Sequence, residues 1–212
     1  MGRIKKGILG GFSGKVGTVV GANWKGIAYM RSFPLKVRDP KTLAQRSQRS
    51  KFALTVNLLK PMNALLRIGW KLYAHGQSPI NAAVSYTLAN AITGVYPDYQ
   101  IDPSKVLISR GGLAPAFNAE VTPANGAIIF EWDDNSGTSA AKQTDKALLA
   151  VVNPAKSDAV FDTEGAERSA GVQSLNLPAH WVGDEVLSYI GFVSEDGREV
   201  ANSLYLGSIT VL

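Results

Sequence analysis

Hydrophobic and polar positions follow different patterns in the two parts of the chain, and the change comes after Tyr96-Pro97. Beyond that point the apolar residues fall in short runs rich in β-branched and aromatic side chains, with turn residues such as Asn125-Gly126 between them. Runs of this kind predict β-strands. The predicted strands are Val106–Ser109, Phe117–Val121, Ala127–Trp132, Lys146–Val152, Asp158–Phe161, Val172–Leu175, Val186–Val193 and Leu204–Val211. Seven or eight short strands over roughly a hundred residues indicate an immunoglobulin-like or fibronectin-like β-sandwich.

The N-terminal part begins with a glycine-rich stretch, in which seven glycines fall within residues 7–26. Lys15–Val20 and Ile27–Phe33 carry the β-branched and aromatic residues of strands, and the residues between them can turn. Residues 15–33 are therefore predicted to form a β-hairpin that ends at Pro34. Glycine inside a strand often marks the close approach of another backbone. Because an isolated hairpin is only marginally stable in water, this one needs a partner sheet, either in the same chain or in another subunit.

Helices are predicted between the hairpin and the sandwich. Asp39-Pro40 and Ser78-Pro79 each place a capping residue before a proline, which is a helix start signal. Pro61 must break or kink the first helix, and Gly94 closes the last. The predicted helical segments are Lys41–Leu59, Met62–Tyr73 and Pro79–Ile92.

These elements predict an α+β fold, in which a β-hairpin and helices precede an all-β immunoglobulin/fibronectin-like sandwich. We place a basic hairpin-plus-helices module at residues 1–97 and an acidic sandwich domain at residues 98–212. No run approaches 18 apolar residues, so no membrane span is predicted. The N-terminus lacks the apolar core of a signal peptide, and we expect a cytoplasmic, virion-associated or appendage-associated protein.

Charge is distributed unevenly between the two parts. Residues 1–80 hold fifteen Lys/Arg and a single acid, Asp39, a balance of +14, whereas residues 81–212 hold seven Lys/Arg and sixteen acids, a balance of −9. Such asymmetry reports on partners more than on fold. The front part is expected to bind something negative, either a polyanion or the acidic part of a neighbouring copy.

Residues with catalytic or metal-binding chemistry are scarce. Gly14-Lys15 is followed by valine and lacks the spacing of a phosphate-binding loop. The chain has no cysteine, and its two histidines, His75 and His180, are expected at turns rather than in a triad or zinc site. Asp133-Asp134-Asn135 has the oxygen ligands of a calcium site, but the same residues are favoured in a hairpin turn, which is the preferred interpretation. We predict no enzymatic activity and no cofactor.

Several segments carry a resemblance that covers most of the chain. Gly10–Gly17, Trp24-Lys25-Gly26, Gln45–Phe52, Glu185–Ser194 and Ser203–Gly207 resemble an uncharacterised family of Bacteroidetes-type bacteria, which has a domain-of-unknown-function label. The resemblance implies a glycine-rich N-terminal arm and an immunoglobulin-like C-terminal domain, and it implies no activity. A shorter resemblance joins Pro40–Arg46 to Pro-x-Thr-x-x-Gln stretches of phage structural proteins.

The charge pattern and the hairpin together predict a structural or interaction protein that self-assembles into homo-oligomers, as part of a virion, filament or appendage. The basic module of one copy would bind the acidic sandwich of the next, head to tail or by strand addition. The alternative is a nucleic-acid-associated protein that binds phosphates through its basic half. The residues expected to make the assembly or polyanion contact are Lys5, Lys6, Lys15, Trp24, Arg46 and Arg49.

Overall fold

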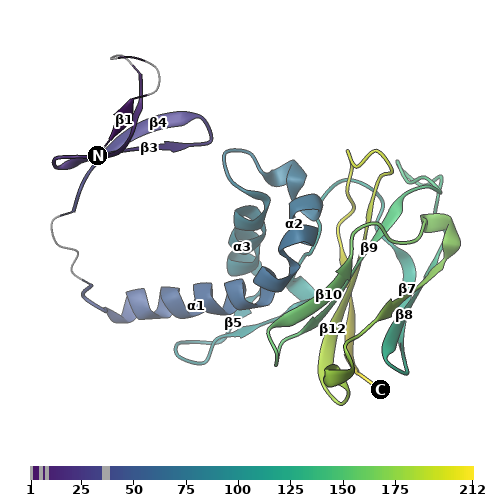
Figure 1. The fold of residues 1–212 in the computed structure, drawn as a ribbon. Helices are drawn as coiled ribbons and strands as arrows, with labels where there is room; N and C mark the ends of the chain where they lie inside the picture. Colours follow the sequence, from purple (N-terminus) through teal and green to yellow (C-terminus); the bar gives the residue numbers. More distant parts are fainter. Residues whose placement is uncertain (1, 5–6, 8–9, 35–38) are drawn as a thin grey trace. The chain divides into compact units, whose positions relative to one another are not determined.

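The computed structural model describes residues 2–4, 7, 10–34 and 39–212 (Figure 1). The chain divides into two compact units, Met1–Thr42 and Leu43–Leu212. The fold class is the predicted α+β, with N-terminal strands, then helices, then a β-rich part. The boundary at 97/98 lies inside the second unit, where helices from before it and strands from after it contribute to one hydrophobic cluster.

The first unit is an antiparallel sheet, here called the small sheet. Its strands lie in sequence order and are β1 Arg3–Ile4, β2 Phe12–Val16, β3 Val19–Trp24 and β4 Ile27–Ser32. Lys25 and Gly26 join β3 to β4 with positive φ angles of 49° and 87°, the geometry of a tight hairpin turn. The hairpin predicted over residues 15–33 is therefore present. The strand predicted at Lys15–Val20 is wrong in its middle, because Gly17-Thr18 turns the chain there from β2 to β3.

The second unit begins with three helices, each followed or preceded by a short 3₁₀ turn. They are α1 Leu43–Leu59, η1 Lys60–Met62, α2 Asn63–Gly69, η2 Lys71–Tyr73 and α3 Pro79–Asn90. Pro61 ends α1 as predicted, and the Ser78 hydroxyl caps α3 by accepting a hydrogen bond from the Asn81 amide at 3.2 Å. The helical segment predicted from Lys41 starts two residues early. Lys41 has a positive φ of 47°, which a right-handed helix cannot include.

Seven strands of the second unit form two antiparallel sheets. They are β7 Phe117–Ala124, β8 Ala127–Asp133, β9 Lys146–Asn153, β10 Asp158–Asp162, β11 Val172–Asn176, β12 Glu185–Val193 and β13 Leu204–Thr210. The sheet orders are β11-β8-β7 and β10-β9-β12-β13, which is compatible with an immunoglobulin-like sandwich. Between residues 116 and 212 the helical segments are the short turns η4 Arg168–Ala170 and η5 Ala179–Trp181, so the prediction of an all-β C-terminal part is confirmed.

The segment that joins the helices to the sandwich is irregular. The strand predicted at Val106–Ser109 is wrong, and the chain before it forms only the two-residue strands β5 Ile92–Thr93 and β6 Gln100–Ile101 and the turn η3 Pro103–Lys105. Instead of pairing in a ladder, the amide of Ile108 donates to the Ser203 hydroxyl at 2.9 Å. Val106 and Ile108 are fully buried, so tertiary packing rather than a sheet holds this segment.

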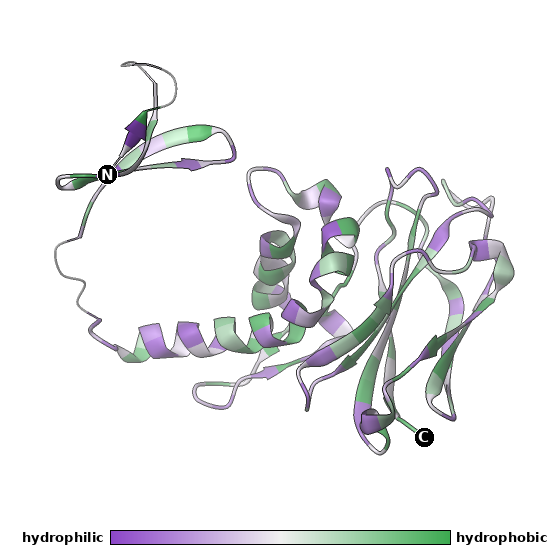
Figure 2. Ribbon diagram, in the orientation of Figure 1, coloured by the Kyte–Doolittle hydropathy of each residue, from purple (hydrophilic) through white to green (hydrophobic). Residues whose placement is uncertain are grey.

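The central strands β9 and β12 are buried on both faces. Every residue of β9 after Lys146 and of β12 after Glu185 is buried, and Figure 2 shows hydrophobic positions continuing along these strands. One face packs against β8 and β11, and the other against the helices (Figure 1). Leu149, Val151, Ile190 and Phe192 lie in the first cluster, and Ala150, Val152, Leu187 and Tyr189 lie in the second. The second unit is thus three layers, with helices, sheet and sheet.

Tyr189 connects the helical layer, the sheet and the irregular segment. Its ring is fully buried in the helix–sheet cluster, 5.3 Å from the ring of Tyr205, and its hydroxyl donates to the Pro103 carbonyl at 3.1 Å. Burial raises the pKa of the Tyr189 phenol above its ordinary value, and the neighbouring Tyr205 and Asp102 add to this shift. The folded protein therefore holds the phenol in its neutral form.

Stability should fall at alkaline pH because of Tyr189. The unfolded chain loses this proton near pH 10, whereas the folded chain retains it to higher pH. Stability is therefore present in full below about pH 10 and is lost as the pH rises from there towards the folded pKa. Tyr189→Phe should cost about 1 kcal/mol at pH 8 through the lost hydrogen bond. Urea unfolding at pH 8 and pH 10.5 should show a shallower alkaline decline for Y189F than for the wild type, and equal slopes would contradict this role.

Candidate functional site

The small sheet has almost no interior. Gly21 is the single buried residue among the described residues of Met1–Thr42. Its exposed large apolar side chains are Ile4, Val16, Val19, Trp24, Ile27, Tyr29, Met30 and Phe33. A sheet is stable in water when another layer covers at least one face, and within this unit no described element does so. The small sheet is therefore the part of the chain that needs a partner surface.

The strand register sorts the side chains of the small sheet onto two faces of different chemistry, because paired residues on neighbouring strands point to the same side. Pairing of Ile4 with Phe12, Val16 with Val19, and Gly21 with Met30 defines the first side, here called the apolar face. The described strand residues on this face carry no charge. Its side chains line a hollow of about 330 Å³.

Gly21 is required on the apolar face because Phe12 lies directly over it. A Cβ atom at position 21 would collide with the carbonyl and the ring of Phe12. A Cβ atom added at Gly11 would likewise collide with the Cβ atom of Ala28. These two glycines leave room for Phe12 over β3 and for Ala28 beside the chain before β2, which agrees with the close approach that the glycine content predicts.

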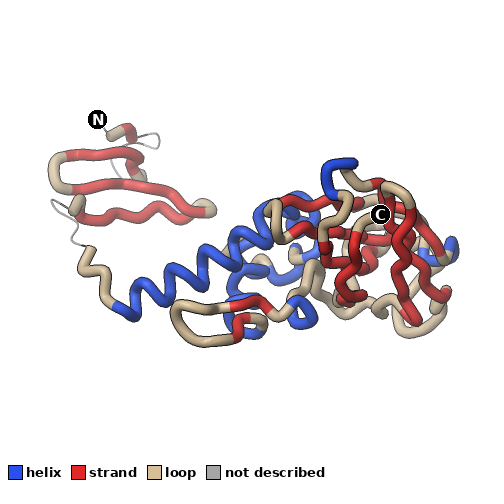
Figure 3. The backbone as a smooth tube through the Cα atoms, turned by 90° about the horizontal axis from the view of Figure 1, so that it is seen from below, coloured by secondary structure: helices blue, strands red, loops and turns tan. Residues whose placement is uncertain are grey.

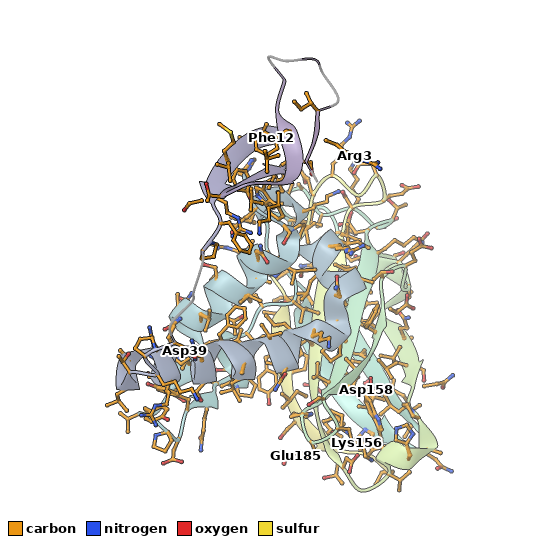
Figure 4. The ribbon with its side chains drawn as sticks, turned by 60° about the vertical axis from the view of Figure 1, so that its left-hand side comes forward. Arg3, Phe12, Asp39, Lys156, Asp158 and Glu185 are labelled. Carbon is orange, nitrogen blue, oxygen red and sulfur yellow. The ribbon has the colours of Figure 1, made fainter. Side chains whose placement is uncertain are left out.

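The opposite side of the small sheet, here called the cationic face, carries basic and aromatic side chains. Lys15 on β2 pairs with Val20 on β3, which pairs with Arg31 on β4, so the three lie in one row across the sheet. Trp24 and Tyr29 lie further along β3 and β4 on the same face, and Trp24 is 52 % exposed. Lys15 Nζ also lies 3.8 Å above the centre of the Phe33 ring, a cation–π contact. Arg3 of β1 also lies on the cationic face, because it pairs with Ser13 of β2. Figure 4 labels Arg3, together with Phe12 of the apolar face.

The residues predicted to make the assembly or polyanion contact are divided between the two units. Lys15 and Trp24 lie together on the cationic face. Arg46 and Arg49 belong to the second unit, on the exposed first half of α1, whose buried residues Thr55 and Leu59 come later. Figure 3 shows α1 as a long rod that meets the rest of its unit through its C-terminal half. Lys5 and Lys6 lie outside the described residues. Sequence reasoning missed Arg31, since its place beside Lys15 follows only from the strand register.

The ionisable residues of the second unit are dispersed. His75 is exposed in the loop before α3, and His180 is exposed in η5. Within the described residues there is no group of three or more His, Cys, Asp or Glu that could hold a metal ion. At the candidate calcium turn, Asp134 accepts a hydrogen bond from the Ser136 amide at 2.9 Å and Asp133 accepts one from the Asn118 side chain at 2.8 Å. The bond to Asp134 closes a local turn, whereas the bond to Asp133 joins β7 to β8. The predicted hairpin turn is wrong, because the segment leads from β8 to β9, which lies in the other sheet.

A cleft of about 630 Å³ opens between α1, β6 and the turn from β9 to β10. Its walls are largely apolar, with Leu54, Leu58 and Leu187 among them, and Glu185 is the one charged side chain of the described residues that line it. Figure 4 labels Glu185 at the same end of the sandwich as Lys156. Lys156 Nζ binds Asp184 Oδ2 at 2.5 Å and the carbonyl of His180. It therefore holds the segment between β11 and β12 and does not line the cleft. Glu185 is the one carboxylate among the described residues that line this cleft, and Tyr99 is the other ionisable side chain there.

The comparison with protein families matches residues 11–207, which spans both units. The chain belongs to DUF6266, a family of unknown function. No curated protein matches the chain. Among the described residues of this DUF6266 protein, no helix is long and apolar enough to cross a membrane.

A buried ion pair in the DUF6266 sandwich escaped prediction from sequence. The side chains of Arg168 and Asp145 are fully buried, with 3.1 Å between Arg168 Nε and Asp145 Oδ2. The guanidinium also donates to Asn135 Oδ1 at 2.6 Å and to the Ala114 carbonyl at 3.0 Å, and it lies 3.9 Å from the centre of the Phe192 ring. Burial lowers the pKa of Arg168, and Asp145 opposes this shift. The pair therefore has a structural role, because it holds Asn135, in the loop after β8, against the core.

Replacing Arg168 should destabilise the protein strongly. Arg168→Met leaves Asp145 buried without its partner, and we expect a loss of about 3–5 kcal/mol in the free energy of unfolding. The double variant R168M/D145L removes both charges and should recover most of that loss. Arg198→Met is the matched control, because Arg198 is 85 % exposed, and it should change stability by less than about 0.5 kcal/mol. Urea denaturation measures all three, and a loss for R168M no larger than for R198M would refute the structural role.

Proposed function

We propose that this protein is a non-enzymatic structural protein that assembles with copies of itself through its N-terminal sheet. The observation that carries the proposal is that the small sheet exposes both faces and buries only Gly21 among its described residues. Covering exposed apolar side chains is the dominant favourable contribution to protein association. A partner layer supplied by another copy would stabilise the sheet and link the subunits in the same step.

The charge distribution supports a partner of the same kind. The small sheet presents Lys15 and Arg31 on one face, whereas residues 81–212 have a formal balance of −9. Opposite charges on two surfaces speed their encounter and select their orientation. Because the two charges belong to one chain, the basic unit of each copy finds its complement in the acidic part of the next.

The edge of the small sheet offers a second means of contact. β4 is the last strand in the order β1-β2-β3-β4, and all six of its residues are exposed. An unpaired strand edge accepts another strand through backbone hydrogen bonds, as in strand addition. A head-to-tail contact closes into a ring or grows into a filament, depending on its rotation. A virion, filament or appendage, in a bacterium of the Bacteroidetes type or its phage, would use such a subunit.

The alternative function is binding of nucleic acid. Trp24 and Tyr29 lie on the same face as Lys15 and Arg31, and aromatic side chains interleaved with cations are suited to stack on bases and bind phosphates. Arg46 and Arg49 of the second unit, and Lys5 and Lys6, are the further cations that this function would use to bind phosphates. This arrangement favours a single strand over a duplex, because stacking requires unpaired bases.

Removal of the first unit tests the proposed function. A variant that lacks residues 1–42 retains the three-layer core of the second unit, so it should fold, as measured by circular dichroism. Light scattering should show an oligomer for the full chain and a monomer for the truncated chain. An oligomer of unchanged size after truncation would remove the small sheet from the mechanism.

Nucleic acid binding separates the two functions. The full chain should form oligomers in the absence of any polyanion. Added DNA or RNA should bind weakly, whereas a dedicated phosphate binder would lose affinity with a slope of about −0.9 per phosphate in log K against log salt on duplex DNA. Fluorescence anisotropy with labelled single-stranded and duplex DNA at several salt concentrations gives this slope. A monomer that binds DNA or RNA with a slope of several units would establish the alternative.

A further inference from the structure

The outer face of the three-stranded sheet is the uncovered side of the sandwich. The four-stranded sheet packs against the helices on its outer side, whereas most outward residues of β7, β8 and β11 are exposed within this unit, with Ile129 half-buried and Ala127 buried among them. These three strands contain no lysine or arginine, and their outward positions include Glu120, Glu131 and Asp133. Phe117 and Val172 lie beside them, 55 % and 49 % exposed. This surface is here called the acidic face.

Two carboxylates on the acidic face are direct neighbours. Glu120 of β7 and Glu131 of β8 are paired across the strands, so their Cβ atoms lie about 5 Å apart. Neither carboxylate has a hydrogen bond or an ion pair to a described residue. Like charges directly opposite in a sheet are destabilising. A cationic side chain from another molecule that binds between Glu120 and Glu131 would relieve this repulsion.

We propose that the acidic face of one copy receives the cationic face of the small sheet of a second copy. This inference rests on the proposed self-assembly and specifies its two surfaces. Lys15 and Arg31 lie two strands apart in one row, about 10 Å, so their long side chains straddle the Glu120–Glu131 pair. The aromatic residues Trp24 and Tyr29 of the cationic face then cover the exposed apolar side chains beside the acids.

The chemistry of the acidic face selects this occupant. Its carboxylates repel nucleic acid and other polyanions, and its three antiparallel strands suit another sheet laid over them face to face. The chain itself supplies a sheet with the opposite charge and with exposed aromatic residues. The contact is head to tail, since the acidic and cationic faces are different surfaces, so it continues from copy to copy until it closes.

The size of the contact predicts its strength. Three strands of five or six residues and the two-residue strand β1 give the small sheet a face of roughly 300 Å², so one contact buries roughly 600 Å² in total, less than the about 1,200 Å² of a standard stable interface. A single contact is therefore weak, and assembly depends on protein concentration and on the second contact at the β4 edge.

Charge reversal and charge exchange test the contact. In E120K/E131K the cations Lys15 and Arg31 meet two lysines, and the dissociation constant of the oligomer should rise by about tenfold or more. Adding K15E/R31E to the same chain restores opposite charges across the contact and should bring the constant back to within about threefold of the wild type. Sedimentation velocity over a concentration series measures the constants, with circular dichroism as the check on folding.

Two control variants separate this contact from the effect of net charge. E164K/E195K reverses two exposed loop acids and changes the net charge by the same amount, so it should assemble like the wild type. E164K/E195K/K15E/R31E has the net charge of the wild type but places acids against the acidic face, so it should fail to assemble. If E120K/E131K does not fold, E131K alone replaces it, because its lysine pairs with Glu120 across the strands and preserves the sheet.

The outcomes distinguish the inference from the proposed function. An oligomeric wild type whose E120K/E131K variant assembles as well as E164K/E195K overturns the acidic face as the receiving surface and leaves self-assembly standing. Loss of assembly in E120K/E131K without rescue by K15E/R31E overturns the cationic face as its partner. A wild type that is monomeric at every concentration overturns the proposed function, and the inference falls with it.

Discussion

Burial of both faces of the β9–β12 strand pair is the constraint on which the second unit depends. Each strand contributes alternate residues to two hydrophobic clusters, one shared with β8 and β11 and the other with the three helices. The helical layer therefore cannot be removed without exposing Ala150, Val152 and Leu187, and the sandwich cannot be removed without exposing Leu65 and Trp70. This is why compactness divides the chain at residue 42 and not at the change in composition near residue 97. Helices and strands here are parts of one body.

Local signals in the sequence predicted most elements of the fold. Ser78-Pro79 and Pro61 act through the backbone of their own segment, and the helix boundaries they predict are confirmed. Long-range packing decided the rest. The run Val106–Ser109 has the composition of a strand, yet it forms no ladder with a strand of the described residues, and burial against the helices and the hydroxyl of Ser203 hold it instead. The Arg168–Asp145 pair joins residues 23 apart in a core, and no local pattern marks an arginine as buried.

The candidate site was predictable in composition but not in arrangement. An excess of cations, a tryptophan and many glycines near the N-terminus pointed to a contact surface there, and Lys15 and Trp24 do share a face. The division of the small sheet into an apolar and a cationic face depends on a turn at Gly17-Thr18, which the strand pattern concealed. The turn predicted across Gly21–Gly26 is confined to Lys25-Gly26, because Gly21 lies within β3 beneath Phe12. This register places Arg31 beside Lys15 on the cationic face. The face that contains Met30 then carries no charged residue of the described strands.

The doubly buried strands also govern how this sequence can vary in evolution. A strand with one solvent-exposed face tolerates amino-acid substitution at every second position. Its sequence therefore varies at alternate residues among relatives. β9 and β12 have no exposed positions after their first residue, because residues that point away from one hydrophobic cluster are buried on the opposite face of the sheet. Divergent members of the family should therefore keep continuous hydrophobic runs here while β7 and β11 change around them. We therefore expect these two strands to be among the parts of the family's sequence that change least.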